Sequence, residues 1–346
     1  MFSHIRSMAV IVAMGAIAVG CGGADSAAEP TTVTLLAHES FVLPDGTFEA
    51  FTAETGITVE VLQTGDAGTI VANAIATAGD PVGDVLFGVD NLLLQRALDA
   101  NVFVAHEAAG LDDVPDRVKL DPQNRVTPID SGYVCVNYRA DALNGAAPPT
   151  SLNDLRQPQL ASQFVTQNPE NSTPGLAFLF ATIASFGEDG WKDFWRDLRD
   201  NGVTITPGWN EAWNNAYVGG DPGGTKGIVN SYASSPVFEG LFGGDDPVVS
   251  EILIDSCFEQ IEFAGVLAGT DAPQNAGKLI DYLLSPAVQS EIPLSMFVEP
   301  VNSTATIPEE FSTWTTPITS PLALTPTEIA ENQARWTQEW LELFRE

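Results

Sequence analysis

Between positions 33 and 100, short apolar segments alternate with segments that are apolar at every third or fourth position. The apolar segments predict strands at 33–37, 57–61 and 84–89. The amphipathic segments predict helices at 47–55, 66–75 and 91–100. Such alternation builds a parallel sheet with helices on both faces, and ligands bind at the carboxyl ends of its strands. His38, Asp66 and Asp90 fall at that predicted edge, so they are candidate ligand contacts.

Longer extended segments interrupt this alternation further along the chain. The segment 126–138 is long enough to cross between two lobes, and the alternating segment 257–263 is predicted to cross back. The remaining periodicity predicts strands at 203–206 and 228–232, helices at 276–284 and 328–345, and an extended segment at 296–301. A chain of 346 residues is also long enough for two domains. The pattern therefore predicts an α/β protein of two lobes.

The stretch 168–187 has the pattern of a loop that turns into a helix. Asn171 and Ser172 are residue types that cap helix N-termini, and Pro174 suits the first helical position. The free N–H groups and the positive dipole end of this helix would face whatever lies in front of Ser172 and Thr173. Such a helix start binds anions or polar groups without a charged side chain, although an ordinary capped helix has the same pattern.

The aromatic residues form two groups. Trp191 and Trp195 lie at helical spacing and predict core positions, whereas Trp209 and Trp213 follow the Pro-Gly pair that ends the strand 203–206. Aromatic residues at strand ends and helix starts in both halves of the chain indicate a cleft that closes on a flat ligand, and aromatic faces attract a cation. This second group consists of His38, Phe41, Trp209, Trp213, Tyr232, Phe238 and Phe297.

Composition and motifs exclude several classes of function. The net charge of −32, from 46 acidic and 14 basic residues, repels nucleic acid, so DNA and RNA are excluded as partners. The sequence has three histidines, and it contains no Gly-x-Ser-x-Gly nucleophile motif and no HExxH or CxxC metal spacing. The Gly-rich segment 219–227 lacks the Gly-Lys-Ser/Thr order of a phosphate-binding loop and is predicted to be a surface loop. Nothing in the chain requires catalysis.

The N-terminus has the order of a signal peptide. Arg6 precedes thirteen apolar or small residues, 8–20, which are too few to span a bilayer, and Cys21 follows. The sequence Ala-Val-Gly-Cys resembles a bacterial lipobox, with Cys21 as the lipidated first residue of the mature protein. We therefore expect a lipoprotein signal peptide at 1–20 and a tether at 21–32. A plain secretory signal is the alternative, and both export the protein.

Two cysteines remain after the expected cleavage, Cys135 and Cys257. An even pair in an exported chain suggests a disulfide, and these two lie in separate segments that are predicted to be strands. A bridge requires those strands to be neighbours. Two isolated buried thiols are the alternative.

Eight segments follow one another along the chain in the pattern of a known family: LLAHESF, DVLFGVDNLLL, VTPIDSGYVCVNY, NPENSTPGLAFL, ITPGWNEAW, IVNSYASSPVF, QIEFAGVLAGT and LLSPAVQSEIP. With these segments the chain resembles the thiamine-binding periplasmic substrate-binding proteins of ABC importers, which have a type II periplasmic-binding-protein fold. The resemblance extends from Val33 to the C-terminus. The segments STPGL, GWNEAW and SYASSP are its most specific parts.

The resemblance implies two lobes, each a mixed sheet flanked by helices, joined by two crossover strands that act as hinges. The expected boundaries are 33–132 with 259–300 for lobe I and 133–258 with 301–346 for lobe II. Thiamine or a thiamine phosphate is expected in the cleft between the lobes. No cofactor and no metal are expected.

The resemblance also implies roles for particular residues. Trp209 and Tyr232 would stack on or flank the heterocycles, while Ser172 and Asp66 with Ala67 would lie at the phosphate or hydroxyethyl end. His38, Phe238 and Phe297 stand where the family often has Tyr, Tyr and Trp, which removes aromatic surface and phenolic donors. The expected ligand-binding residues are His38, Asp66, Ala67, Asp90, Ser172, Thr173, Trp209, Trp213, Tyr232, Phe238 and Phe297.

The partners that the resemblance implies are a thiamine-class small molecule, a membrane ABC permease, and the membrane itself through a lipid anchor at Cys21. The protein would be a monomer, anchored on the outer face of the cytoplasmic membrane or periplasmic. Two alternatives stay open. The same fold binds other solutes, such as a polyamine, a phosphonate or another cationic heterocycle. An exported enzyme on this fold would need a convergent acid–base pair in the cleft.

Overall fold

The structure is a computed structural model that describes residues 31–220, 223–244 and 247–345. The predicted signal peptide, most of the tether and Cys21 lie outside these residues. The strands are β1 (Thr32–Ala37), β2 (Thr58–Gln63), β3 (Val85–Asp90), β4 (Phe103–Val104), β5 (Thr127–Tyr138), β6 (Phe164–Gln167), β7 (Thr204–Thr206), β8 (Ile228–Tyr232), β9 (Glu251–Leu267) and β10 (Glu299–Pro300). They form a sheet of order β2-β1-β3-β9-β5-β8-β6-β7, in which β4 also pairs with β9 and β10 with β5.

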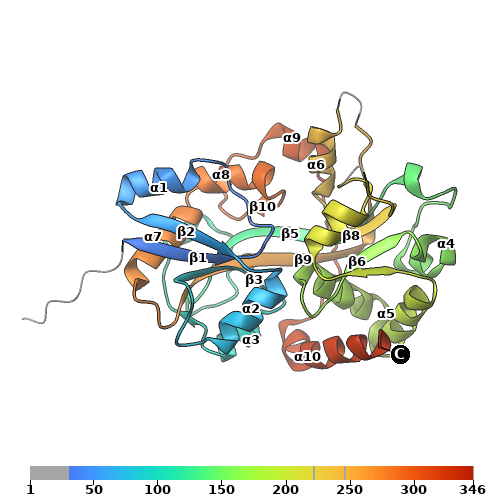
Figure 1. Ribbon diagram of the computed structural model, residues 1–346, viewed down its shortest axis with the longest axis horizontal. Helices are drawn as coiled ribbons and strands as arrows, with labels where there is room; N and C mark the ends of the chain where they lie inside the picture. The colour runs from blue at the N-terminus through green and yellow to red at the C-terminus, as the bar shows by residue number, and fades with distance from the viewer. Residues whose placement is uncertain (1–30, 221–222, 245–246, 346) are drawn as a thin grey trace, which may run out of the picture.

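Helices cover both ends of this sheet (Figure 1). They are α1 (Thr47–Thr55), α2 (Ala67–Ala76), α3 (Leu94–Asp99), α4 (Pro158–Ala161), α5 (Thr173–Asp200), α6 (Ser235–Phe242), α7 (Pro273–Leu283), α8 (Pro286–Ser295), α9 (Glu309–Trp314) and α10 (Pro326–Leu343). We call β1–β3 with α1–α3, α7 and α8 the first half, and β6–β8 with α4–α6, α9 and α10 the second half. Within the described residues no helix has the length and apolar character needed to span a membrane.

Strands β5 and β9 run side by side through both halves (Figure 1). They pair antiparallel from Thr127 opposite Ala264 to Tyr138 opposite Glu251. The carboxyl-terminal part of β9 also pairs with β3, and that of β5 pairs with β8. The prediction of two crossing segments is confirmed, although β9 is longer than the predicted 257–263. Because the two crossing strands bond to each other, the halves share one continuous sheet instead of having separate ones.

A disulfide joins these two strands. Cys135 lies in β5 and Cys257 in β9, both are fully buried, and their sulfur atoms are 2.07 Å apart. The two strands are neighbours, as a bridge between them requires. Ala233 and Ile318 pack around the disulfide in a small apolar cluster.

Two helices differ from the pattern-based prediction. The predicted stop at Ser285-Pro286 is followed directly by α8, because proline at the first turn of a helix costs no hydrogen bond. The helix predicted from 168–187 continues as α5 through Trp191 and Trp195 to Asp200, with a non-helical break at Gly187 (φ 71°, ψ 175°). Both tryptophans are fully buried, which confirms them as core residues.

Candidate ligand-binding site

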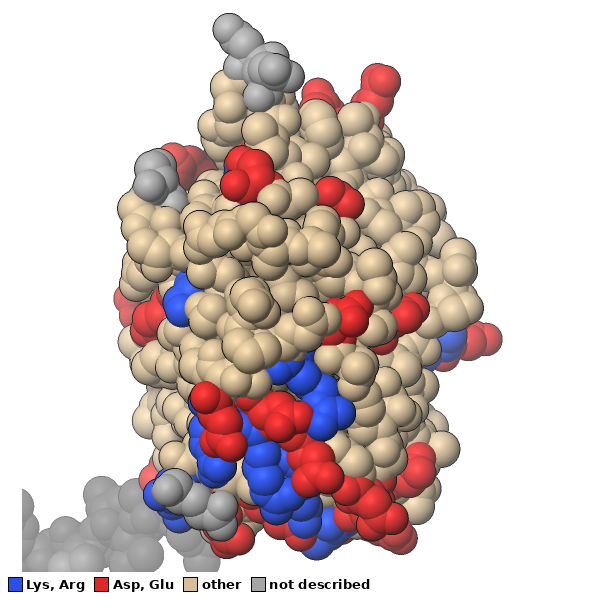
Figure 2. All heavy atoms as spheres, turned by 90° about the vertical axis from the view of Figure 1, so that its right-hand side faces the viewer, with Lys and Arg blue, Asp and Glu red and all other residues tan. Residues whose placement is uncertain are grey.

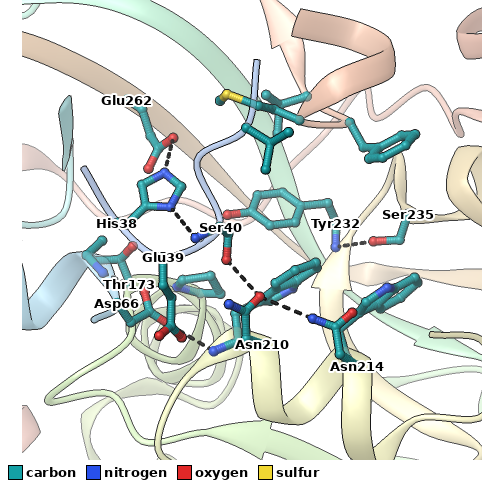
Figure 3. A pocket seen from close by; sticks show the side chains of 18 of the residues that line it. His38, Glu39, Ser40, Asp66, Thr173, Asn210, Asn214, Tyr232, Ser235 and Glu262 are labelled. Atoms are coloured by element: carbon teal, nitrogen blue, oxygen red, sulfur yellow. Dashed lines mark hydrogen bonds and ion pairs between the residues drawn. The ribbon is translucent and has the colours of Figure 1, made fainter. Parts of the chain in front are cut away.

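A cavity of about 380 Å³ lies between the two halves (Figure 3). Its lining comes from the carboxyl ends of strands and the starts of helices, where both halves meet. The predicted residues that line it are His38, Asp66, Ala67, Thr173, Trp209, Trp213, Tyr232, Phe238 and Phe297. The structure thus brings together residues that are as much as 259 positions apart in the sequence, from His38 to Phe297. Their role as ligand contacts stays a prediction.

One wall of the cavity is aromatic. A π-helical turn, Glu211–Ala216, follows Trp209 and stacks its Trp213 against the Trp209 ring, with centroids 5.7 Å apart and planes 8° apart. Trp213 is 3% exposed and also packs against Tyr217 and Phe238, so it holds the Trp209 ring in place. Trp209 also donates from Nε1 to Ser231 Oγ at 3.0 Å, which fixes the plane of its ring. A flat ligand would therefore meet a preorganised indole surface.

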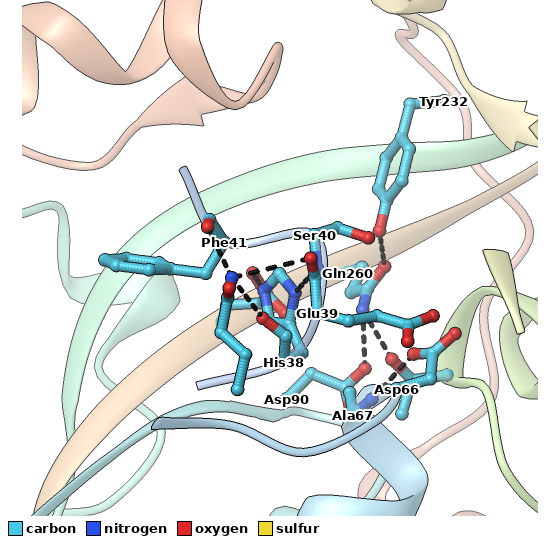
Figure 4. Close-up of polar contacts among 12 residues, drawn as sticks. His38, Glu39, Ser40, Phe41, Asp66, Ala67, Asp90, Tyr232 and Gln260 are labelled. Carbon is cyan, nitrogen blue, oxygen red and sulfur yellow. Dashed lines mark hydrogen bonds and ion pairs between the residues drawn. The ribbon is translucent and has the colours of Figure 1, made fainter. Parts of the chain in front are cut away.

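Tyr232 completes this wall and is held from below (Figure 4). Its ring meets Trp209 edge-on at 6.5 Å, and its hydroxyl donates to Gln260 Oε1 at 2.8 Å. The Gln260 amide donates in turn to Asp90 Oδ2 at 2.7 Å and to Thr173 Oγ1 at 2.9 Å. Gln260 thus couples Tyr232 of the second half to Asp90 of the first half.

Three acidic residues lie in one row across the neighbouring strands β3, β9 and β5. Asp90 in β3 is in register with Glu262 in β9, which is in register with Asp130 in β5. Asp90 and Asp130 are fully buried, and burial followed by the charge of Glu262 raises the pKa of Asp90 to about 7 and that of Asp130 well above its usual range. Glu262 reaches the cavity, where its Oε2 lies 3.6 Å from His38 Nε2.

His38 follows β1 and faces Glu262 (Figure 3). Burial disfavours the imidazolium form, but the charges of Glu262, Asp66 and Glu39 outweigh burial and raise the pKa of His38. The Ser40 backbone N–H donates to His38 Nδ1 at 3.2 Å, which requires a lone pair on that nitrogen. In the neutral ring the proton therefore lies on Nε2, toward Glu262.

Asp66 connects the two halves at the start of α2. Its Oδ1 accepts from the Ala67 N–H at 2.6 Å and its Oδ2 from the Trp209 N–H at 2.9 Å. Burial is the largest effect on this carboxyl and raises its pKa, although these N–H bonds oppose the rise. Gly68 allows the close approach, because a Cβ there would lie 2.5 Å from the Asn171 carbonyl oxygen. The starts of α2 and α5 therefore meet at the cavity.

Two further contacts cross the cavity. Ser40 Oγ donates to Asn210 Oδ1 at 3.0 Å (Figure 3). Ser234 Oγ, before α6, donates to the Phe297 carbonyl at 2.5 Å. Phe297 has a φ of 57°, a conformation that is costly for a bulky residue and that recurs at functional sites. The strained turn places the Phe297 ring 5.7 Å from Phe238, edge to face.

Two predicted ligand contacts, Asp90 and Ser172, are not part of the lining. Asp90 is fully buried because its Oδ1 accepts from the N–H groups of Leu92 and Leu93, so its carboxylate points into the fold. Ser172 is the N-cap residue of α5, as predicted, but its side chain makes no capping bond. Its buried hydroxyl has no hydrogen-bond partner of ordinary geometry among the described residues, yet it is near enough to Asp66 to lower that pKa.

Several lining residues were not predicted. They include Glu39, Ser40, Asn210, Asn214, Ser235, Glu262 and Met296. Glu39 and Ser40 directly follow His38, so the strand-end rule that selected His38 applies to them as well. For Glu262 the signal was a lone acid in the otherwise apolar end of a buried strand, since such a charge requires a partner or a ligand.

Aromatic rings and carboxylates line the cavity together. No group of His, Cys, Asp and Glu side chains in the described part of the chain has the arrangement of a metal site. An indole ring, a phenol ring and carboxylates line one space the size of a small molecule, and hydrogen bonds between the halves lie around it. Fold and site together define a protein that encloses a small solute between two halves of one sheet.

Comparison with known proteins agrees with this class. A model of the bacterial extracellular solute-binding protein family matches residues 80–315, and the chain belongs to that family. The chain is 29% identical over 314 residues to the thiamine-binding periplasmic protein of Escherichia coli K12, covering 89% of this chain and 92% of that one. The family match confirms a solute-binding protein and not an enzyme.

Solved structures show the same fold. A periplasmic thiamin binding protein superposes with a TM-score of 0.78 at 27% identity, covering 90% of this chain and 96% of that one. Iron-bound HitA from Pseudomonas aeruginosa has a TM-score of 0.68 at 19% identity, covering 91% and 99%, which shows likeness of fold alone. The chain has the type II periplasmic-binding-protein fold, as the sequence predicted.

Proposed function

We propose that this protein captures thiamine outside the cytoplasmic membrane and delivers it to the permease of an ABC importer. The proposal depends on one observation: aromatic rings and carboxylates line the same cavity. The rings are those of Trp209 and Tyr232, and the carboxylates are those of Glu39, Asp66 and Glu262. Thiamine combines two flat heterocycles with a fixed positive charge, and both properties match such a cavity. The relatives described above, which are named for thiamine binding, support the same ligand.

Capture would proceed by closure of two lobes about β5 and β9. We place lobe I at 33–132 with 259–300 and lobe II at 133–258 with 301–346. The bonds Asp66–Trp209 and Ser40–Asn210 join these lobes, so the arrangement described here corresponds to the closed state. A ligand that touches both lobes binds the closed state better and shifts the equilibrium toward it.

Attachment to the membrane would come from Cys21. The lipobox-like sequence before it supports cleavage after Gly20 and lipidation of the cysteine, which leaves residues up to 32 as a tether. The protein would act as a monomer beside its permease. Mass spectrometry of protein from a lipoprotein-processing host tests this proposal: we expect a diacylated Cys21, and a Cys21→Ser variant should be released in soluble form.

Titration calorimetry of the purified protein with thiamine tests the proposed ligand. We expect one site per chain and a Kd of about 1 µM or lower. Small-angle scattering should show a smaller radius of gyration when thiamine is bound, because closure brings the lobes together. Putrescine and 2-aminoethylphosphonate serve as comparison ligands. Heat with one of these and none with thiamine would overturn the proposal.

A further inference from the structure

The protonation state of the His38 ring bears on a contact between the two halves (Figure 3). His38 Nδ1 accepts from the Ser40 backbone N–H at 3.2 Å. Ser40 Oγ donates in turn to Asn210 Oδ1 at 3.0 Å, and this second bond crosses from the first half to the second. Because an N–H donor requires a lone pair on Nδ1, the arrangement that joins the halves belongs to the neutral ring.

A proton on Nδ1 would break the bond to Ser40. The imidazolium ion carries a hydrogen on both nitrogens, so two N–H groups would face each other. The ring itself is confined by β3: a Cβ on Gly88 would lie 2.7 Å from His38 Cδ2, and the Phe87 ring centroid lies 5.6 Å from that of His38. The Ser40 segment would have to move instead, and this segment carries the bond to Asn210.

The carboxylates around His38 come from several elements of the first half. Those of the described residues that line the cavity are Glu39 beside His38, Asp66 before α2 and Glu262 in β9. Glu262 Oε2 lies 3.6 Å from His38 Nε2. Asp90 in β3 and Asp130 in β5 lie beyond Glu262 in the same row across the sheet. The ring is therefore surrounded by negative charge.

Positive side chains lie elsewhere. From the second half the charge of Glu211 acts on Glu39, so this half brings a further acid and no base to the site. Basic side chains gather among acidic ones at the end of the second half that faces the viewer in Figure 2. Arg156 and Lys192 form ion pairs with carboxylates of that half. Among the described residues that line the cavity, His38 is the one side chain that titrates to a positive charge near neutral pH.

His38 is thus the protein's own cation in an acidic cavity. Burial alone would lower the pKa of His38, but the charges of Glu262, Asp66 and Glu39 outweigh burial and raise it. In the empty cavity the imidazolium form therefore persists to a higher pH than in a free histidine. A ligand with a fixed positive charge would meet the same carboxylates.

We propose that the imidazolium proton of His38 and the cationic ligand compete for these carboxylates, so that binding expels the proton from Nδ1 to solvent and acid favours release of the ligand. This inference rests on the proposed function and adds its regulation by pH. Two positive charges in a cavity of about 380 Å³ lie within about one Debye length of each other, so dissolved ions screen their repulsion little. The neutral ring also holds Ser40, which is bonded to Asn210, so charge and geometry favour the same state.

Titration calorimetry with thiamine at pH 8 and pH 6 tests the proposal. Binding should weaken as the pH falls through the raised pKa of His38 in the empty protein, because a proton must then leave before the cation is bound. We expect thiamine to bind about 10-fold more weakly at pH 6 than at pH 8. At the lower pH, buffers of different ionisation enthalpy should reveal the release of up to about one proton per thiamine bound.

His38→Asn distinguishes the ring from the acids around it. Asparagine offers an oxygen to the Ser40 N–H but does not titrate. The ratio of the Kd at pH 6 to that at pH 8 should fall to about 3-fold or less, and the remainder would come from carboxyls such as Asp90, whose pKa burial raises to about 7. His106→Asn is the matched control, because His106 pairs with Asp281 at 2.8 Å and does not line the cavity. It should keep the wild-type ratio.

Nuclear magnetic resonance of the wild type provides a test that needs no variant. In protein labelled at the histidine rings, the midpoint of the His38 titration should fall by about one pH unit or more when thiamine is bound. The His106 signal should titrate alike with and without thiamine. An unchanged His38 midpoint, or a wild-type pH ratio in His38→Asn, would overturn this inference while the thiamine proposal stands. Failure of thiamine to bind at either pH would overturn the proposed function as well.

Discussion

The carboxylate of Asp66 accepts a hydrogen bond from the backbone N–H of Trp209 at 2.9 Å, and this bond crosses the cavity. Asp66 begins α2 in the first half, and Trp209 follows β7 in the second half. The same residue pair therefore supplies a negative charge, an aromatic surface and a connection between the halves. The proposed ligand binding and the proposed closure would therefore both involve this contact.

Asp66→Asn separates these roles. Asparagine caps a helix as well as aspartate does, so α2 should remain and the Tm of the empty protein should change by about 2 °C or less. The variant loses a charge-assisted bond to Trp209 and one carboxylate beside the ligand. We expect thiamine to bind about 10-fold more weakly or worse, measured by calorimetry. Unchanged affinity would show that the Asp66–Trp209 contact does not contribute to the ligand-bound state.

Trp209→Ala tests whether the exposed indole is a binding surface. Trp209 is half-buried and stacks on Trp213, so its loss should weaken thiamine binding by about 10-fold or more through lost ring contact. The Tm of the empty protein should change little. Trp191→Phe is the matched control: Trp191 is fully buried, so this change should cost roughly 1–3 kcal/mol of stability and leave the affinity intact. A large fall in stability for Trp209→Ala would make Trp209 a structural residue.

Local patterns in the sequence predicted which residues at strand ends and helix starts lie near the ligand site. His38 and Asp66 came from the rule that ligands sit at the carboxyl ends of parallel strands, and both line the cavity. Asp90, which the same rule selected, does not line the cavity. Its carboxylate turns back to the N–H groups of Leu92 and Leu93, and a strand-end position alone does not tell which way such a side chain points.

The neighbours that strand register gives to a residue were beyond sequence reasoning. Glu262 faces Asp90 and Asp130 only because β9 pairs with both β3 and β5, and the pairing partners of a long strand are set by the whole sheet. The contact between Asp66 and Trp209 likewise arises only when the two halves meet. The alternation of strands and helices was sufficient to predict the fold class. The acidic character of the cavity could not be predicted, because its carboxylates come together only in the folded structure.

The disulfide should stabilise the fold without affecting the ligand. Cys135 and Cys257 are 122 positions apart and neither lines the cavity. Replacing both by alanine should lower the free energy of unfolding by ~2–5 kcal/mol, because the unfolded chain loses a large closed loop. Denaturant unfolding measures this, and calorimetry should give the wild-type Kd. Reducing agent should lower the free energy of unfolding of the wild type and leave that of the double variant unchanged. An equal decrease in both proteins would contradict the prediction.

Buried acids should make the empty protein more stable at pH 5 than at pH 8. Burial, followed by the charge of Glu262, raises the pKa of Asp90 to about 7, above its ordinary value of 3.8. Between these two values the folded state binds more protons than the unfolded state, so stability falls as pH rises from about 4 through about 7. Asp90 alone should account for a few kcal/mol of this loss, since one pKa unit corresponds to about 1.4 kcal/mol.

Asp90→Asn removes that titration while an amide oxygen still accepts from Leu92. We expect the stability difference between the variant and the wild type, from denaturant unfolding, to shift in favour of the variant as pH rises from 5 to 8. Asp121→Asn is the control. Burial acts on Asp121 too, but hydrogen bonds from Arg125 outweigh it and lower the pKa of this carboxyl. A lowered pKa keeps Asp121 charged across this range, so the destabilisation caused by Asp121→Asn should be constant. If the two variants respond alike to pH, the charge of Asp90 does not govern the slope, and Asp130, whose pKa burial also raises, would be the next candidate.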